Sequence, residues 1–191
     1  MLFASAVEIA RAQYGLTVRN GEIGSNVWGA DRFDIVTMFH VLEHLPDPML
    51  GISYAAGLLK PEGILIIQVP NISSIQARLF RNAWYGLDVP RHVINFTPKA
   101  IECLFTRLGF EYFQSSRFSL RDNPASIASS LAPWLDPARR KGRGAGYPIA
   151  DGIAELAYFG LFLLALPFSF LESALGLGGT IWACATKGSR Q

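Results

Sequence analysis

The three histidines are the residues of this chain most able to do chemistry, and two of them flank a glutamate in the segment His40-Val41-Leu42-Glu43-His44. An unperturbed imidazole titrates near neutral pH, so His44 and His92 are candidate general bases. The alternative for His44 is a loop histidine that hydrogen-bonds the backbone and shapes the site. Either interpretation puts a functional site at residues 40–44.

The same five residues match H-x-x-E-H, in which two histidines one helical turn apart hold zinc and the glutamate acts as the base of a peptidase. That chemistry needs His40 and His44 on one face of a continuous helix. Here the motif directly follows a strand-like run, and Pro46 and Pro48 interrupt any helix within a turn. A zinc peptidase is therefore a remote alternative, and we expect no metal site.

The elements around the motif follow the order strand, loop, helix, strand, which is typical of one βαβ unit. Phe33–Phe39 and Ile64–Val69 are short, apolar and β-branched, which predicts strands buried on both faces of a parallel sheet. Asp47-Pro48 supplies an N-cap and a first-turn proline for the helix between them, and Lys60–Gly63 predicts the turn that ends it. A right-handed crossover then places the histidines at the carboxyl edge of the sheet, where open α/β sheets bind ligands.

Two stretches of this unit, FDIVTMFHVLEHLPDP and LLKPEGILIIQVPN, resemble the fourth strand, its loop, the next helix and the fifth strand of class I S-adenosylmethionine-dependent methyltransferases. The stretch LDVPRHVINFTPKAIECLFTRLGFE is similar to the branch that contains the ubiquinone-biosynthesis O-methyltransferases. Together they cover about half of the chain. The resemblance implies a Rossmann-like α/β fold with S-adenosylmethionine as cofactor.

By this resemblance the chain carries a partial sheet, with strands 3 to 7 present and strands 1 and 2 missing. The glycine-rich loop that lets the backbone approach the cofactor is missing with them. We therefore expect a chain truncated at its N-terminus, whose fourth strand shows an unpaired edge, or a sheet that closes around the gap. The expected strands are Leu16–Arg19, Phe33–Phe39, Ile64–Val69, Phe110–Phe118 and Thr180–Thr186, with helices over 4–14, 71–80 and 97–108.

The resemblance also assigns cofactor-binding positions. Glu22 matches the acidic position that contacts the adenine amino group, and Ile23 would pack on the ring; a solvent-facing turn carboxylate is the alternative for Glu22. Phe39 and His40 match positions that line the methionine end, although Phe39 is equally well interpreted as a core residue. Some relatives of the ubiquinone type hold a divalent cation with carboxylate and histidine positions here, which a single HVLEH does not establish.

The implied activity is transfer of a sulfonium methyl group to a small-molecule acceptor, with a hydroxyl oxygen as the favoured target. His92 lies in a mixed aromatic and polar loop where Tyr85, Asp88 and Arg91 could orient that acceptor. In such an SN2-like transfer the protein mainly aligns the reactants, and a base is needed where the nucleophile carries a proton. The alternative is a truncated, non-catalytic methyltransferase-like module with an interaction or membrane-surface role.

Residues 1–191 are predicted to form a single methyltransferase-like domain, in which residues 119–178 are an insertion between the last two strands. Its first part, 121–148, is rich in Pro, Gly, Ser and Arg and predicts a loop with a short helix over 125–131. Residues 153–175 are strongly apolar but interrupted by Pro167, so we expect a helix pair that rests on the protein or dips into a membrane surface, suited to a lipid-linked acceptor. A buried hairpin or a homodimer contact is the alternative.

Composition limits the remaining classes. With 191 residues, 50% hydrophobic, the chain can bury one substantial core. A net charge of +2 without a dense basic tract gives no footprint for nucleic acid. Two cysteines, Cys103 and Cys184, fit a reducing compartment, and no signal peptide is apparent. We expect a cytoplasmic protein, or one that is peripheral at the membrane.

Overall fold

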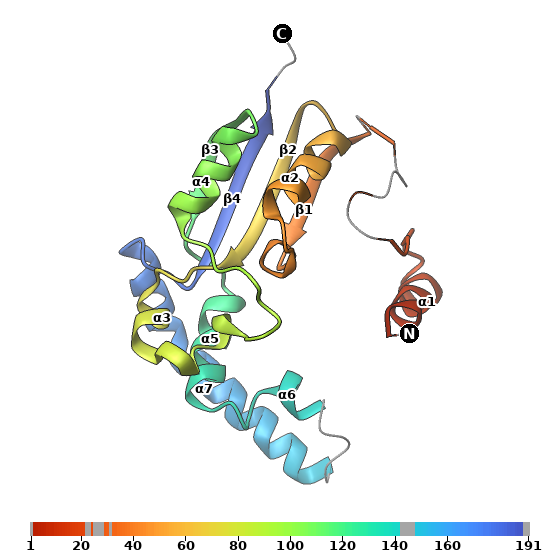
Figure 1. Ribbon diagram of the computed structural model, residues 1–191. Helices are drawn as coiled ribbons and strands as arrows, with labels where there is room; N and C mark the ends of the chain where they lie inside the picture. Colours follow the sequence, from red (N-terminus) through yellow and green to blue (C-terminus); the bar gives the residue numbers. More distant parts are fainter. Residues whose placement is uncertain (1, 22–23, 25–28, 31, 142–147, 189–191) are drawn as a thin grey trace.

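The computed structural model describes residues 2–21, 24, 29–30, 32–141 and 148–188, and within them it forms a four-stranded mixed sheet with helices (Figure 1). The predicted α/β class is confirmed. The elements in chain order are α1 (Leu2–Tyr14), β1 (Phe33–Phe39), α2 (Pro48–Leu58), β2 (Leu59–Pro70), α3 (Ile75–Phe80), α4 (Pro98–Arg107), β3 (Phe110–Ser116), α5 (Asp122–Leu131), α6 (Pro137–Lys141), α7 (Pro148–Ala174) and β4 (Thr180–Lys187).

The βαβ unit forms as predicted. β1 pairs parallel to β2, and α2 connects them with Asp47 as its N-cap, whose side chain accepts a hydrogen bond from the Leu50 amide at 3.0 Å. The expected turn at Lys60–Gly63 is wrong in detail, because β2 already begins at Leu59. The register with β1 is irregular at this end, and Glu62 has a positive φ of 62°. The residues expected to form the turn therefore lie within β2 and form a bulge there.

One face of the sheet is covered more fully than the other. Burial alternates along the second half of β2, where Leu65, Ile67 and Val69 are fully buried and the residues between them are half-buried. α2 and α4 pack on the buried face and contribute Ile52 and Phe105 to one core (Figure 1). The prediction that these strands are buried on both faces is therefore wrong, because the described helices that reach the core lie on a single face.

The strand order is β1-β2-β4-β3, and β4 runs antiparallel to both of its neighbours. The outer edge of β1 pairs with no described strand, which agrees with the expected unpaired edge of the fourth strand. The strand predicted over Leu16–Arg19 is wrong, because these residues are described without strand structure and Leu16 is exposed. No strand among the described residues lies beside this segment to form a sheet with it.

α5, α6 and α7 lie between β3 and β4 in the chain, and α5 packs against α7 at the end of the sheet where β1 and β2 finish (Figure 1). The predicted helix over 125–131 is confirmed as part of α5. The predicted helix pair over 153–175 is wrong: α7 is one continuous helix that contains Pro167. A single proline removes one backbone hydrogen bond, and the long apolar helix spans the position without a break.

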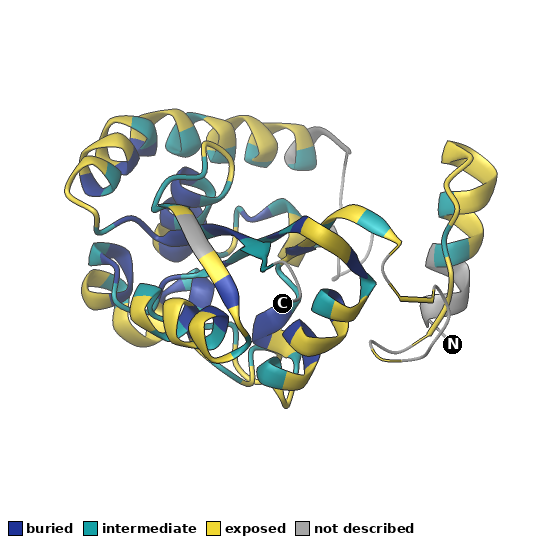
Figure 2. Ribbon diagram, turned by 90° about the horizontal axis from the view of Figure 1, so that it is seen from above, coloured by how far each residue is buried: buried dark blue, intermediate teal, exposed yellow. Residues whose placement is uncertain are grey.

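α7 exposes most of its apolar surface. Figure 2 shows this long helix along one side of the molecule, with its outer surface exposed. The 24 residues Asp151–Ala174 are long and apolar enough to cross a membrane, and within them the most apolar stretch of 18 residues has a mean hydropathy of 1.8 and is only 11% buried. The opposite face holds Ser169 and Glu172, which are fully buried against the rest of the chain.

Candidate functional site

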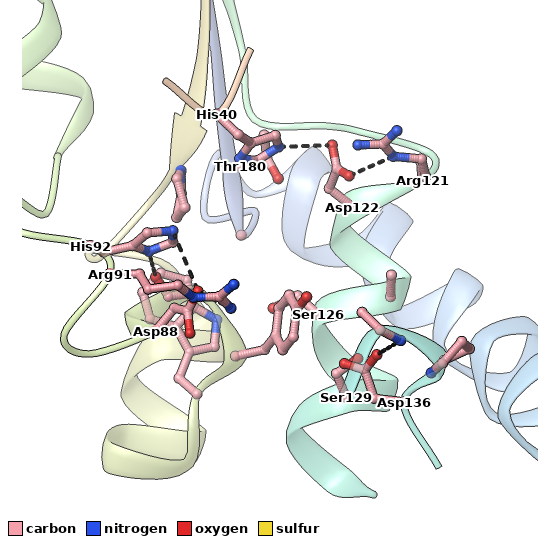
Figure 3. A pocket seen from close by; sticks show the side chains of 18 of the residues that line it. His40, Asp88, Arg91, His92, Arg121, Asp122, Ser126, Ser129, Asp136 and Thr180 are labelled. Carbon is pink, nitrogen blue, oxygen red and sulfur yellow. Dashed lines mark hydrogen bonds and ion pairs between the residues drawn. The ribbon is translucent and has the colours of Figure 1, made fainter. Parts of the chain in front are cut away.

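The carboxyl ends of β1 and β2 open onto a cavity of about 500 Å³ (Figure 3). His40 follows β1 directly, and Pro70 is the last residue of β2. α5, α7 and the loop that contains His92 all contribute residues to its wall. The lining residues used below are His40, His44, Trp84, Tyr85, Asp88, Arg91, His92, Asp122, Ser126, Ser129, Asp136 and Tyr158.

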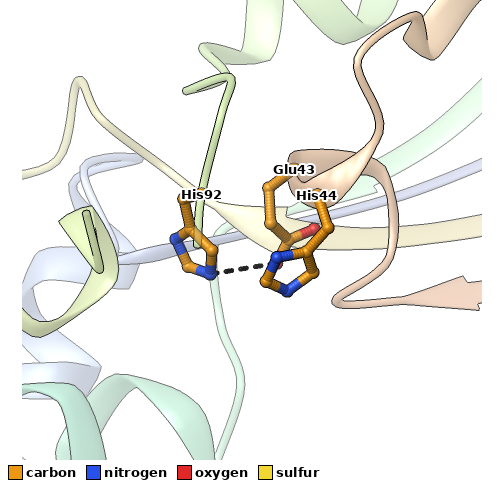
Figure 4. A group of neighbouring side chains, drawn as sticks. All are labelled: Glu43, His44 and His92. Carbon is orange, nitrogen blue, oxygen red and sulfur yellow. Dashed lines mark ion pairs between the residues drawn. The ribbon is translucent and has the colours of Figure 1, made fainter. Parts of the chain in front are cut away.

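His44 and His92, the two predicted bases, are brought together although they lie far apart in the chain (Figure 4). Their rings meet edge to face with centroids 4.8 Å apart. His44 Nδ1 donates to the Arg91 carbonyl at 2.8 Å, and His92 Nδ1 donates to the Gly86 carbonyl at 2.8 Å. Because a carbonyl only accepts, each Nδ1 carries the proton, and each Nε2 is left as a proton acceptor.

A buried carboxylate stands beside this pair. Glu43 is 1% exposed, and its Oε1 lies 3.9 Å from His92 Nε2. Asp88 Oδ2 lies 4.0 Å from the same nitrogen. Two carboxylate oxygens therefore flank the Nε2 atom of His92, where a proton would be taken up.

The same three side chains also offer ligand atoms for a cation. One atom each from Glu43, His44 and His92 lies within 4.8 Å of the others. Histidine ligands of metals commonly donate the second ring nitrogen to a carbonyl, as both histidines do here. The expectation of no metal site rested on the helix interrupted after H-x-x-E-H and on a single HVLEH segment, whereas this grouping includes His92 from a distant loop.

His40 has a different environment from His44. Its Nδ1 lies 3.0 Å from Glu43 Oε1 and its Nε2 lies 3.5 Å from Asp122 Oδ2. Hydrogen bonds to Asp122 and Glu43 raise the pKa of His40 to about 9, although burial opposes the shift. Burial would raise the pKa of Asp122, but hydrogen bonds from His40, Ser119 and Arg121 hold it below its usual value. His40 is therefore a fixed imidazolium at neutral pH.

The backbone and the contacts of His40 argue against the zinc-peptidase alternative. His40 has a positive φ of 52° and ends the strand, and residues Leu42–His44 form only a 3-10 turn. Both ring nitrogens of His40 face carboxylates, so the ring is not available as a zinc ligand beside His44. The continuous helix that H-x-x-E-H requires is not formed.

The described residues supply only part of a cofactor site. Glu22 and Ile23 lie outside the described residues. Phe39 stands at the end of β1 and is 50% exposed, so it is not the core residue of the alternative interpretation, and it could pack against a bound cofactor. His40 lines the cavity, but both of its ring nitrogens face carboxylates, those of Glu43 and Asp122. The described residues thus fit the acceptor half of a methyl-transfer site more completely than its cofactor half.

Several lining residues were not anticipated from sequence. Asp122, Ser126, Ser129, Asp136 and Tyr158 all come from the segment between β3 and β4. Gln68 Nε2 donates to Asp122, which links β2 to α5. No motif marks these residues, because they reach the cavity only through the packing of α5 and α7 against the end of the sheet.

A mixed sheet with a ligand-sized cavity at the carboxyl ends of its parallel strands is the arrangement of class I methyltransferases. The model of a family described as "Methyltransferase domain" matches residues 5–115, more than half of the chain. The chain belongs to this family of S-adenosylmethionine-dependent enzymes.

The chain is similar in sequence to ubiquinone biosynthesis O-methyltransferases. It is 38% identical to that of Haemophilus ducreyi over 55 residues, which are 29% of this chain and 23% of the relative. It is 39% identical to that of Coxiella burnetii (strain Dugway 5J108-111) over 70 residues, which are 37% of this chain and 27% of the relative. The chain thus matches about a quarter of the length of these curated relatives.

Solved structures show the fold over a larger part of the chain. A SAM-dependent methyltransferase from Thermotoga maritima superposes with a TM-score of 0.59 and 17% identity, over 95% of this chain and 68% of that one. Phosphoethanolamine N-methyltransferase 2 of Haemonchus contortus, solved with S-adenosyl-L-methionine, has a TM-score of 0.51 and 13% identity, over 85% of this chain and 35% of that one. At 17% and 13% identity, these likenesses show the fold alone.

Proposed function

We propose that the protein transfers a methyl group from S-adenosylmethionine to a hydroxyl oxygen of a small-molecule acceptor bound in the cavity. The observation that carries the proposal is the pair His44 and His92, with both Nδ1–H groups fixed by carbonyls and both Nε2 atoms free to accept a proton. The names of the ubiquinone-type relatives support oxygen as the acceptor atom.

In this mechanism S-adenosylmethionine supplies a sulfonium methyl group to the acceptor oxygen. His92 Nε2 would take the hydroxyl proton as the oxygen–carbon bond forms and the sulfur–carbon bond of the cofactor breaks. Glu43 and Asp88 then stabilise the imidazolium through their carboxylates. S-adenosylhomocysteine would leave as the neutral thioether, and the imidazole would then pass the proton to solvent. His44 stacks edge to face on His92 and limits its rotation. The protein otherwise aligns the acceptor, because proximity supplies much of the acceleration of such a transfer.

The test begins with binding of S-adenosylhomocysteine, measured by calorimetry on the purified chain. Methyl transfer is then followed with radiolabelled S-adenosylmethionine and two hydroxylated probes, catechol and methyl α-D-glucopyranoside. We expect His92→Asn to lower the rate by about 10²- to 10⁴-fold, the usual contribution of a general base. Lys99→Ala, an exposed change on α4, is the control and leaves the rate unchanged. Equal rates for His92→Asn and the wild type would refute the base assignment.

We propose further that the exposed face of α7 lies on an anionic membrane surface. Leu156 and Leu164 are 72% and 78% exposed, and Trp134, just before α6, is also largely exposed. α6 carries the exposed Arg139, and Arg140 is ion-paired to Asp151, so this basic helix lies beside the start of α7. Exposed apolar side chains next to basic ones match a surface of acyl chains and anionic headgroups.

A helix lying along the surface fits the contacts better than one crossing the bilayer. α7 packs against α5 through a hydrogen bond between Tyr158 and Ser129 at 2.9 Å, and Glu172 is buried in protein contacts. Hydrocarbon would not satisfy these polar groups. A lipid-linked acceptor would reach the cavity from this side, because Tyr158 belongs to both α7 and the cavity wall.

Vesicle flotation tests the membrane proposal. The wild-type chain should float with phosphatidylserine-containing vesicles, and the double change Leu156→Ser with Leu164→Ser should abolish flotation. Leu79→Ser, at an exposed leucine of α3, is the matched control and should float. Sedimentation as a dimer that the double change dissociates, without flotation, would show that a second copy covers α7 instead.

A further inference from the structure

The lower part of the cavity, away from the histidines, is walled by the inserted helices. Ser126 and Ser129 come from α5, Tyr158 from α7, and Asp136 from the link that leads into α6 (Figure 3). Tyr85 faces them from the loop that carries His92. None of these residues has a part in the proton transfer proposed above.

Asp136 is the distinctive residue of this region. It is 3% exposed, and its Oδ1 accepts a hydrogen bond from the Ala138 amide at 2.8 Å. Its Oδ2 is buried and has no hydrogen-bond partner among the described residues. The other two cavity carboxylates are both paired: Asp88 with Arg91 at 2.6 Å, and Asp122 with His40 and Arg121. A buried acceptor oxygen without a donor is costly, so this one is expected to meet a donor on a ligand.

Two other buried polar atoms of the cavity residues are also without partners among the described residues: Ser126 Oγ and Trp84 Nε1. The three atoms differ in kind. A carboxylate oxygen only accepts, an indole N–H only donates, and a serine hydroxyl does both. An ammonium group could donate to the carboxylate and to the serine hydroxyl but offers no acceptor for the indole N–H, whereas neighbouring hydroxyl groups both donate and accept and so match all three.

We propose that this region is a subsite for a polyhydroxylated acceptor, a pyranose-like or cyclitol ring whose hydroxyls bond Asp136 Oδ2 and Ser126 Oγ. The proposal rests on the proposed function, since it takes the cavity as the acceptor site. The aromatic rings of Tyr85 and Tyr158 also line the cavity and provide apolar walls for the C–H groups of such a ring. Asp136 is then a specificity-determining residue.

The electrostatics of the walls agree with this placement. Burial raises the pKa of Tyr85, and the charges of Asp136 and Asp88 raise it further. Burial also raises the pKa of Tyr158; a hydrogen bond from Ser129 opposes the shift, and the charge of Asp136 adds to it. The Asp136 carboxylate is thus close enough to act on both tyrosines.

Ligand-observed NMR on the full chain tests the subsite. The probes are methyl α-D-glucopyranoside, methyl α-D-galactopyranoside, methyl α-D-mannopyranoside and myo-inositol, with catechol and n-propylammonium as comparisons. Asp136→Asn keeps the oxygen that caps Ala138 and turns Oδ2 into a donor. Ser126→Ala removes the second partner and carries the test should Asp136→Asn fail to fold. Asp47→Asn changes a helix-capping aspartate outside the cavity and serves as the matched control.

We expect at least one polyol to bind the wild type and Asp47→Asn equally, and to bind Asp136→Asn or Ser126→Ala at least tenfold more weakly. Sites that hydrogen-bond a substrate hydroxyl discriminate strongly when the pairing is lost. The proposal is overturned if no polyol binds, if binding is unaffected by either change, or if only catechol or propylammonium depends on Asp136.

S-adenosylhomocysteine binding, measured on the same samples, separates the two proposals. Polyol binding that depends on Asp136 in a chain that does not bind S-adenosylhomocysteine would support the subsite and refute the proposed transfer by this chain. S-adenosylhomocysteine binding without any polyol binding would leave the transfer standing and refute the subsite.

Discussion

Glu172 on α7 is a fully buried carboxylate whose ionisation should make stability depend on pH. Its Oε1 accepts hydrogen bonds from Gln76 Nε2 at 2.5 Å, Asn123 Nδ2 at 3.2 Å and the Gly179 amide at 3.3 Å. Its Oε2 is buried without a partner among the described residues. Burial raises the pKa of Glu172 to about 7, and the three donors offset only part of that rise.

The sign of the pH effect follows from the higher pKa in the folded state. Between the ordinary value of 4.5 and about 7 the folded chain binds more protons than the unfolded chain, so the free energy of unfolding falls as pH rises through this range. One pKa unit corresponds to about 1.4 kcal/mol, so the contribution of Glu172 should fall by about 2–3 kcal/mol between pH 5 and pH 8.

Glu172→Gln isolates this contribution. The amide oxygen can accept the same three hydrogen bonds but does not ionise, so the variant should gain about 2–3 kcal/mol over the wild type between pH 5 and pH 8. Urea unfolding followed by circular dichroism at both pH values gives the difference. Glu155→Gln, an exposed change on the same helix, should show no such gain. A wild-type-minus-variant difference that is equal at pH 5 and pH 8 would refute the reasoning.

Three further predictions follow from single contacts. NMR titration should show His40 protonated up to about pH 9, and Asp122→Asn should lower that pKa toward 6.5 by removing its main hydrogen-bond partner; an unchanged pKa would contradict this. Asp47→Ala should lower the free energy of unfolding by about 1 kcal/mol, the usual value of an N-cap, whereas Asp47→Asn should not. Gly179→Ala should lower the melting temperature, because the added Cβ would lie 2.8 Å from the Gln76 side chain; an unaltered melting temperature would show that Gln76 moves freely.

Local chemistry explains which parts of the fold could be predicted from the sequence. The βαβ unit was predicted because Asp47-Pro48 and the apolar runs on either side act over a few residues. The helix over Pro98–Arg107 was predicted for the same reason, since Thr97 caps it by accepting a hydrogen bond from the Ala100 amide. Such signals do not depend on distant parts of the chain.

The errors arose where a distant partner decides the outcome. Leu16–Arg19 has strand-like residues, but a strand needs a neighbour, and none is described beside it. The helix pair expected around Pro167 is one continuous helix, because a proline inside a helix removes only one backbone hydrogen bond and the hydrogen bonds of the neighbouring turns remain. The burial of β2 on one face depends on where α2 and α4 pack, which the strand sequence does not contain.

The candidate site also has a part that could be predicted from local sequence and a part that depends on distant contacts. The sequence by itself determined that His44 and His92 could act as bases and that the first follows a strand of an α/β sheet, because residue type and local pattern suffice for both. Only the tertiary structure decided that the two imidazoles meet, that His40 is held as an imidazolium by Asp122, and that Asp136 enters the cavity. These are contacts between segments far apart in the chain, which the packing of α5 and α7 against the end of the sheet creates.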